Sequence, residues 1–131
     1  LINETWLKLH KVDGWNDRQH FLRAAAIAMR QVLVDSAREH YAEKRGGGMQ
    51  PDTISAAERV AAGSDDEVIL VDEALARLQL LDPRLAQVVE CRFFAGYNEE
   101  ETAQALGISD RTVRRDWLKA KAWLYVEMAP N

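Results

Sequence analysis

The stretch 98–113 constrains the fold of this chain more than any other, because it specifies two helices and a sharp turn between them. Asn98 with Glu101 three residues later is typical of a capping box, which opens a short helix. Gly107 is the residue type best able to take the left-handed conformation of a tight turn, and Ser109 can cap the next helix. We therefore expect a helix-turn-helix here.

The helix after this turn, from about Asp110 to Met128, is expected to have one buried and one solvated face. The buried face repeats every three or four residues and consists of Val113, Trp117, Ala120 and Leu124. The opposite face carries side chains that can donate to base edges and phosphates, namely Arg111, Thr112, Arg114, Arg115 and Lys119. Asp110, Arg111 and Arg114 are the candidates for base contact, with Arg115 and Lys119 on phosphates. A basic face alone is usually only solvated, but combined with the turn and the small Ala103 it favours DNA binding, with the first turn in the major groove.

The rest of the chain also shows helical periodicity without sustained strand alternation, so we predict an all-α fold of two small helical domains joined by a flexible linker. Residues 1–45 form the first domain, the glycine-rich residues 46–64 the linker, and residues 65–131 a four-helix helix-turn-helix domain. The expected helices are 2–10, 17–43 capped by Asp17, 66–81 capped by Ser64 or Asp65, and one opening at Asp82-Pro83. Expected core residues are Phe21, Ala25, Ala28, Val32 and Leu33 in the second helix, and Ile69, Leu70, Ala74, Leu75 and Leu78 in the third.

Charge and composition exclude several classes of function. The net charge of −4 over 131 residues argues against a chain that coats nucleic acid along its whole length. Scattered histidines, a single cysteine (Cys91, expected in the core) and the lack of a glycine-rich phosphate loop argue against a metal site, a cofactor and an enzyme. No apolar run approaches membrane-spanning length and no disulfide can form within the chain, which fits the cytoplasm. A start without Met suggests missing N-terminal residues.

The N-terminal third resembles part of region two of an extracytoplasmic-function (ECF-like) sigma factor. Leu-Ile-Asn-Glu-Thr-Trp-Leu-Lys-Leu at residues 1–9 is similar to the family's helix that grips the β′ clamp helices of RNA polymerase, which implies polymerase-binding roles for Asn3, Glu4 and Lys8. The loop 15–19 corresponds to one that captures a flipped base, and residues 20–48 resemble the helix and basic tail that handle the minus-ten promoter element. The resemblance implies DNA contacts by Asn16, Arg18, Arg38, Lys44 and Arg45.

The C-terminal half looks like a complete sigma region four. The motifs are Leu81-Asp82-Pro83-Arg84, Arg92-Phe93-Phe94-Ala95-Gly96-Tyr97, Glu100-Glu101-Thr102-Ala103 and Arg111-Thr112-Val113-Arg114-Arg115-Asp116-Trp117. In the family this region reads the minus-thirty-five element and touches the β-subunit flap. Leu80, Leu85 and Phe94 could serve the flap contact or belong to the core, and the core is the favoured interpretation.

The resemblance implies a sigma factor that binds core RNA polymerase and directs promoter recognition on double-stranded DNA, with an anti-sigma factor as an optional partner. One alternative is a stand-alone helix-turn-helix transcriptional regulator in which residues 1–45 dimerise or sense a ligand. Another is a helical interaction module whose basic face is merely solvated. Co-purification with core polymerase separates the first alternative from the sigma factor hypothesis, and binding to DNA separates the second.

Overall fold

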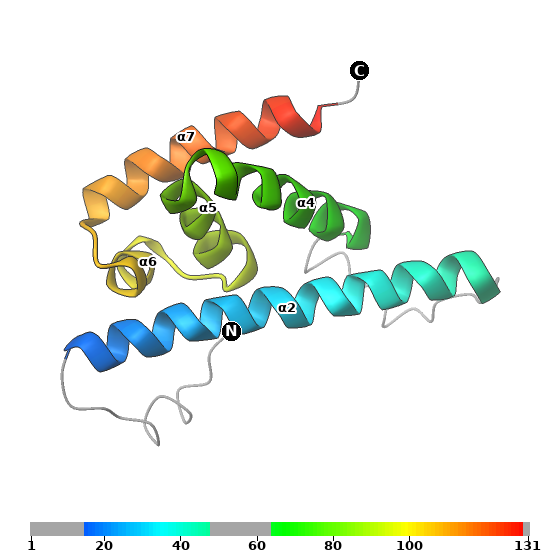
Figure 1. The fold of residues 1–131 in the computed structure, drawn as a ribbon, viewed down its shortest axis with the longest axis horizontal. Helices are drawn as coiled ribbons and strands as arrows, with labels where there is room; N and C mark the ends of the chain where they lie inside the picture. Colours follow the sequence, from blue (N-terminus) through cyan, green and yellow to red (C-terminus); the bar gives the residue numbers. More distant parts are fainter. Residues whose placement is uncertain (1–14, 48–63, 130–131) are drawn as a thin grey trace.

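The computed structural model describes residues 15–47, with side chains from 17 to 43, and residues 64–129. The described elements are α2 (Trp15–Gly47), α4 (Asp65–Leu81), α5 (Pro83–Val89), a π-helical turn η1 (Glu90–Phe94), α6 (Glu99–Leu106) and α7 (Asp110–Met128). Every element in these two ranges is helical, which confirms the predicted all-α class (Figure 1). The predicted helix 2–10 lies outside the described residues.

Local capping fixes where the C-terminal helices begin. The Ser64 hydroxyl accepts a hydrogen bond from the Glu67 amide at 3.0 Å and starts α4. Asp82 ends α4 and caps α5, where its carboxylate accepts from the Leu85 amide at 3.3 Å. Pro83 is the first residue of α5, a position where no amide donor is needed. Both predicted helix starts are therefore confirmed.

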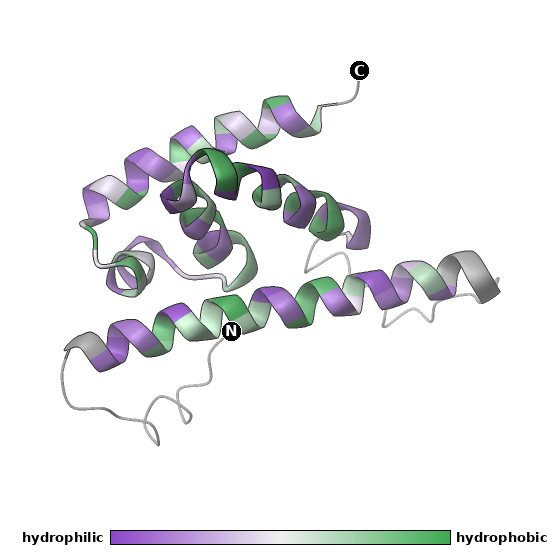
Figure 2. Ribbon diagram, viewed as in Figure 1, coloured by the Kyte–Doolittle hydropathy of each residue, from purple (hydrophilic) through white to green (hydrophobic). Residues whose placement is uncertain are grey.

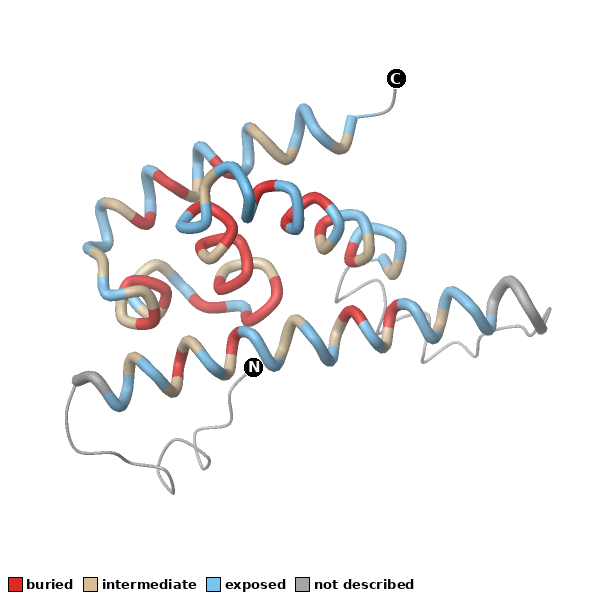
Figure 3. Tube along the Cα trace, in the orientation of Figure 1, coloured by how far each residue is buried: buried red, intermediate tan, exposed pale blue. Residues whose placement is uncertain are grey.

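Helix α5 packs against α4 and α7 and leads into η1, which contacts α2 (Figures 1 and 3). A core cluster joins α2, α4, α5, η1 and α7 through Val34, Ala37, Val68, Val71, Leu75, Leu78, Leu85, Ala86, Val89, Phe94 and Ala120. A second cluster joins the start of α2 to η1 and α6 through Leu22, Ala26, Cys91, Ala95, Tyr97 and Ala105. Figure 2 shows α4 and α5 as the most apolar helices and the start of α7 as mostly hydrophilic.

Helix α2 runs across the C-terminal helices and contacts α4, η1 and α6 (Figure 1). Its buried face differs from the prediction: it consists of Leu22, Ala26, Val34 and Ala37, with Met29 and Leu33 partly buried. Val32 is 65% exposed and Ala28 is exposed, so the prediction that they belong to the core is wrong. The helix also begins at Trp15, which places Asp17 in the first turn instead of at the cap. In α4, Leu70 is likewise exposed.

The end of α5 widens into the π-helical turn η1, a feature that the sequence pattern does not predict. The Glu90 carbonyl accepts from the Ala95 amide at 3.1 Å, and the Cys91 carbonyl from the Tyr97 amide at 3.0 Å. Gly96, with φ of 72°, then turns the chain toward α6. The side chains of Glu90 and Cys91 are both buried in this turn.

Helix α2 extends through Gly47 and so includes the first two residues of the predicted linker, and residues 48–63 lie outside the described ranges. The division into two domains stays a prediction. The part of α2 that is described shares both core clusters with the C-terminal helices. None of the helices in the described ranges is long and apolar enough to cross a membrane.

Candidate nucleic-acid interface

The start of α6 is fixed by a complete capping box. The Asn98 side-chain oxygen accepts from the Glu101 amide at 2.8 Å, and the Glu101 carboxylate accepts from the Asn98 amide at 2.9 Å. Two amides that the helix leaves free are satisfied in this reciprocal way. The box predicted from the sequence is confirmed, and it sets the position of the short helix that precedes the turn.

The turn between α6 and α7 depends on Gly107. This residue has φ of 68° and ψ of 37°, the left-handed conformation, and its amide donates to the Ala103 carbonyl at 2.8 Å. The Ile108 amide donates to the same carbonyl at 3.1 Å. Ser109 then caps α7, because its hydroxyl oxygen accepts from the Thr112 amide at 3.1 Å. Three adjacent residues therefore fix the angle at which α7 leaves α6.

Replacing Gly107 by alanine is expected to lower the free energy of unfolding by about 1 kcal/mol, because an L side chain is strained in the left-handed region. A Cβ at this position would also lie 2.8 Å from the Gln19 side-chain nitrogen of α2, a flexible group that can move aside. Urea unfolding of Gly107→Ala, alone and with Gln19→Ala, measures the two contributions. An unchanged midpoint in Gly107→Ala would contradict the conformational argument; near-complete recovery with Gln19→Ala would assign the loss to the clash.

The inner face of α7 is anchored to the rest of the C-terminal helices. Val113 and Ala120 are completely buried. Trp117 contacts two cations, with the Arg92 guanidinium 5.2 Å and the Lys121 ammonium 5.3 Å from its ring centre. These contacts orient the helix, so its remaining face is presented to solvent.

A partly buried ion pair adds a second anchor for α7. The Asp116 carboxylate is buried and accepts two hydrogen bonds from the Arg84 guanidinium of α5, at 2.7 and 3.3 Å. Such a two-point pair fixes both distance and orientation. The Arg115 Nε atom lies 3.7 Å from the same carboxylate. Asp116 therefore links the helix that carries the basic face to α5.

The predicted DNA-contacting residues of α7 come together on its outer face. Asp110, Arg111, Arg114, Arg115 and Lys119 are exposed and Thr112 is half-buried. Arg114 has a partner in the protein: its guanidinium donates to the Glu99 carboxylate of α6 at 3.1 and 3.3 Å. The exposed face thus offers a cluster of long donors at the start of one helix, with one of them paired across the turn.

The residues expected to handle the minus-ten element lie on α2, and the structure describes the side chains of two of them. Arg18 donates to the Gln104 side-chain oxygen of α6 at 2.9 Å. The guanidinium of Arg38 lies 3.6 Å from the Asp72 carboxylate and 4.0 Å from that of Glu73, both on α4. The backbones of Asn16, Lys44 and Arg45 belong to α2, but their side chains are not described. The predicted polymerase-binding residues Asn3, Glu4 and Lys8 lie outside the described residues.

Three acidic residues that organise this surface were missed at the level of the sequence. Asp116 interrupts the basic run of α7, Glu90 is a single acid in an apolar stretch, and Glu99 precedes the capping-box glutamate. An isolated acid among apolar residues is a signal of a buried ion pair. That signal is present for Glu90, whereas Asp116 directly follows two arginines and nothing local indicates that Glu99 meets Arg114.

Two other side chains of potentially reactive types, Cys91 and Tyr97, are buried, and burial favours their protonated forms. Burial raises the pKa of the Cys91 thiol to about 12, while Arg23 opposes the shift and Glu90 adds to it. Burial also raises the pKa of Tyr97, whose hydroxyl donates to the Leu22 carbonyl at 2.8 Å. No group of three or more His, Cys, Asp or Glu side chains suited to a metal ion occurs in the described part of the chain. The predicted core position of Cys91 is confirmed.

Two of the three residues considered for a flap contact prove to be core. Leu85 and Phe94 are buried, whereas Leu80 is 87% exposed. The favoured interpretation is confirmed for the first two and wrong for Leu80. An exposed leucine at the end of α4 remains available to a partner protein.

Comparison with known proteins identifies a family. The family model described as ECF sigma factor matches residues 1–130, which is nearly the whole chain. Neither the comparison with curated proteins nor that with solved structures finds a match. The match spans both the α2 region and the helix-turn-helix residues, in agreement with the motifs and with the exposed arginines of α7. The chain therefore belongs to the ECF sigma factor family.

Proposed function

We propose that this protein binds core RNA polymerase and directs it to promoters by reading two DNA elements at once. The observation that carries the proposal is the orientation of α7: Val113, Asp116 and Ala120 form its buried inner face, and Arg111 and Arg114 are exposed on its first turns. A helix so anchored can place these side chains in a major groove. The match to the ECF sigma factor family supports promoter DNA as the target.

Within this proposal the two ends of α7 differ in role. Arg111 and Arg114, in the first turns with Asp110, contact base edges of the minus-thirty-five element, where arginine can bond guanine at two points. Arg115 and Lys119 lie further along and contact phosphates, which give affinity without sequence preference. Thr112 is half-buried beside the Ser109 cap and contributes to the fit between the start of α7 and the DNA groove.

The α2 region supplies the second contact. Asn16, Arg18, Arg38, Lys44 and Arg45 engage the minus-ten element, and Asn3, Glu4 and Lys8 bind the β′ clamp helices. Leu80, exposed at the end of α4, is the described residue best placed for an apolar contact with the β flap. Two modest DNA contacts on one chain act at high effective concentration, which suits a protein with a net charge of −4.

The test is transcription in vitro with core RNA polymerase, the full chain and a promoter library. We expect run-off products that require this protein, and co-purification of the protein with core polymerase. Binding to DNA without any association with polymerase would support the stand-alone regulator instead. Absence of both DNA binding and polymerase binding would leave only the interaction module.

A further inference from the structure

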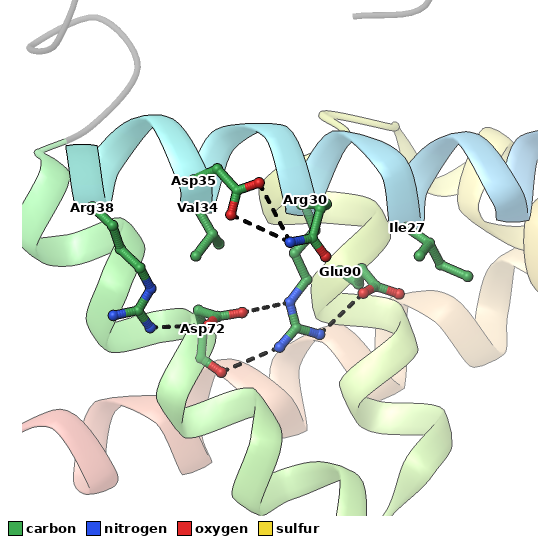
Figure 4. Close-up of a pocket in the computed structure, with 8 residues that line it drawn as sticks. Ile27, Arg30, Val34, Asp35, Arg38, Asp72 and Glu90 are labelled. Carbon is green, nitrogen blue, oxygen red and sulfur yellow. Dashed lines mark hydrogen bonds and ion pairs between the residues drawn. The ribbon is translucent and has the colours of Figure 1, made fainter. Parts of the chain in front are cut away.

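Several acids of this protein hold arginines between helices. Glu90, 6% exposed in the turn η1, accepts from the Arg23 guanidinium at 2.5 Å and from that of Arg30 at 3.0 Å. Arg30 also donates to the Asp72 carboxylate at 2.8 Å and to the Asp72 carbonyl at 3.2 Å (Figure 4). Both partners of these pairs are largely buried, with side chains no more than 24% exposed. The pairs therefore fix α2 to the C-terminal helices.

The pair of Glu99 and Arg114 differs because it lies at the surface proposed to meet DNA. The Arg114 side chain is 58% exposed and that of Glu99 is 35% exposed. Arg114 belongs to the outer face of α7, whereas Glu99 is the first residue of α6 and directly follows the capping residue Asn98. Partly exposed pairs of this kind add little to stability, which favours a role in DNA contact over a role in holding the two helices together.

The two hydrogen bonds engage only one edge of the Arg114 guanidinium. Glu99 Oε2 accepts from Nε at 3.3 Å, and Oε1 accepts from Nη2 at 3.1 Å. Nη1 and the second N–H of Nη2 stay available, because the guanidinium is planar and its donors point in fixed directions. These remaining donors form a second fork, which matches the O6 and N7 acceptors of guanine in the major groove. Arg114 can therefore bind Glu99 and a guanine at the same time.

Glu99 changes what Arg114 gains from each kind of group on DNA. A carboxylate beside a guanidinium cancels much of its charge, so contact with a phosphate releases fewer counterions and contributes less affinity. A base edge carries no net charge and can still accept from the free donors. The two bonds to Glu99 also restrict the arginine side chain before DNA arrives, so less conformational entropy is lost on binding. Both effects favour base contact over phosphate contact.

We propose that Glu99 is a positioning residue that determines sequence specificity: it holds one edge of Arg114 and directs the free edge of the guanidinium to a guanine of the promoter. The inference rests on the proposed function, in which Arg114 contacts a base edge. Specificity then depends on both helices, since α6 supplies the acid and α7 the arginine. The turn at Gly107 sets the position of one relative to the other.

The test compares Glu99→Ala with Glu100→Ala in the full chain. Both variants remove one negative charge from the first turn of α6, where acids favour the start of a helix. Glu100 is exposed and does not bind Arg114, so it is the matched control. Affinity is measured by fluorescence anisotropy on a duplex that the wild-type chain selects from a random library and on a duplex of random sequence. If the free chain selects no duplex, its complex with core RNA polymerase is used.

We expect Glu99→Ala to lower the ratio of the affinities for selected and random duplexes about tenfold, because Arg114 keeps its charge but loses its orientation. Random DNA should be bound as tightly as by the wild type or more tightly, since a negative charge is lost. Glu100→Ala should behave in the same way on random DNA but leave the ratio unchanged. An unchanged ratio in Glu99→Ala, or an equal decrease in both variants, would overturn the inference.

A second measurement identifies the base that Arg114 reads. Each guanine of the selected duplex is replaced in turn by 7-deazaguanine, which lacks the N7 acceptor. The guanine bound by Arg114 is the one whose replacement weakens binding by the wild type but not by Arg114→Ala. Replacing this guanine should have a smaller effect on Glu99→Ala than on the wild type, with equal effects at the other guanines. Equal effects at this guanine too, or the absence of such a guanine, would overturn the inference.

A double variant separates positioning from a direct contact of Glu99 with DNA. Adding Glu99→Ala to Arg114→Ala should leave the affinity ratio as low as in Arg114→Ala alone, because Glu99 acts through the arginine. A further decrease would refute the positioning role. A decrease in Arg114→Ala without any in Glu99→Ala would overturn the inference and leave the proposed function intact. Absence of binding to every duplex, by the wild-type chain and by its complex with core polymerase, would instead overturn the proposed function and with it the role of Glu99.

Discussion

Arg111→Ala combined with Arg114→Ala is expected to lower affinity for a promoter duplex selected by the wild-type protein about a hundredfold or more, to near that for random DNA. Each arginine that bonds a base edge at two points contributes about 1–3 kcal/mol of discrimination. Both side chains lie on the exposed face of α7, so their removal leaves the buried anchors of the helix untouched. Fluorescence anisotropy on selected and random duplexes measures the effect.

The matched control removes the same number of charges from the same helix. Arg115→Ala with Lys119→Ala should weaken binding to selected and random duplexes alike, and should reduce the salt dependence of the affinity by about 0.9 for each phosphate that the variant no longer neutralises. The ratio between selected and random DNA should therefore collapse only in the first double variant. Equal decreases of that ratio in both would contradict the assignment of base contacts to Arg111 and Arg114.

Arg111 and Arg114 differ in that only Arg114 is bound by Glu99. Glu99 holds the Arg114 guanidinium through two hydrogen bonds, so Arg114 must leave or share this partner when it meets DNA. Arg111 is exposed on the same face, and Glu99 does not hold it, so we expect the larger decrease in affinity from Arg111→Ala as a single variant.

The elements that were predicted correctly are those specified by neighbouring residues. The capping box of Asn98 and Glu101, the left-handed Gly107, the Ser109 cap and the Asp82-Pro83 start each satisfy backbone groups within four residues. Such hydrogen bonds are specified by residues close in the sequence, so their pattern can be recognised without knowing the rest of the fold. The start of α7 follows from the Ser109 cap, and the bounds of the helix agree with the prediction.

The features that were missed depend on partners distant in the sequence. Periodicity indicates that residues 17–43 are helical, but which stripe is buried is decided by α4, η1 and α6. The prediction therefore puts Val32 in the core, whereas the structure buries Val34. The π-helical turn and the pairs made by Glu90 and Asp116 likewise need residues on other helices. The basic face of α7 is predictable from the sequence; the engagement of Arg18 and Arg38 by C-terminal residues is not.

Glu90→Ala is expected to lower the free energy of unfolding by about 3 kcal/mol, the typical effect of removing one partner of a buried ion pair. Arg23 and Arg30 would remain, mostly buried, around an apolar side chain, although Arg30 keeps Asp72. Urea unfolding followed by far-UV circular dichroism measures the change. The control is Glu73→Ala. The Glu73 carboxylate is half-exposed and lies 4.0 Å from Arg38, so its removal should lower the free energy of unfolding by less than about 0.5 kcal/mol.

The decrease in the free energy of unfolding caused by Glu90→Ala also sets a lower limit on the free energy with which α2 docks on the C-terminal helices. If the C-terminal helices stay folded after α2 leaves, Glu90 becomes hydrated and its removal costs nothing further in that open state. The measured decrease in the free energy of unfolding then cannot exceed the free energy of docking. The reason is that the variant can adopt the open state, in which the guanidinium groups of Arg23 and Arg30 are hydrated. A decrease near 3 kcal/mol therefore requires docking at least that strong, whereas a decrease no larger than that of Glu73→Ala would mean that the ion pairs of Glu90 contribute little to stability.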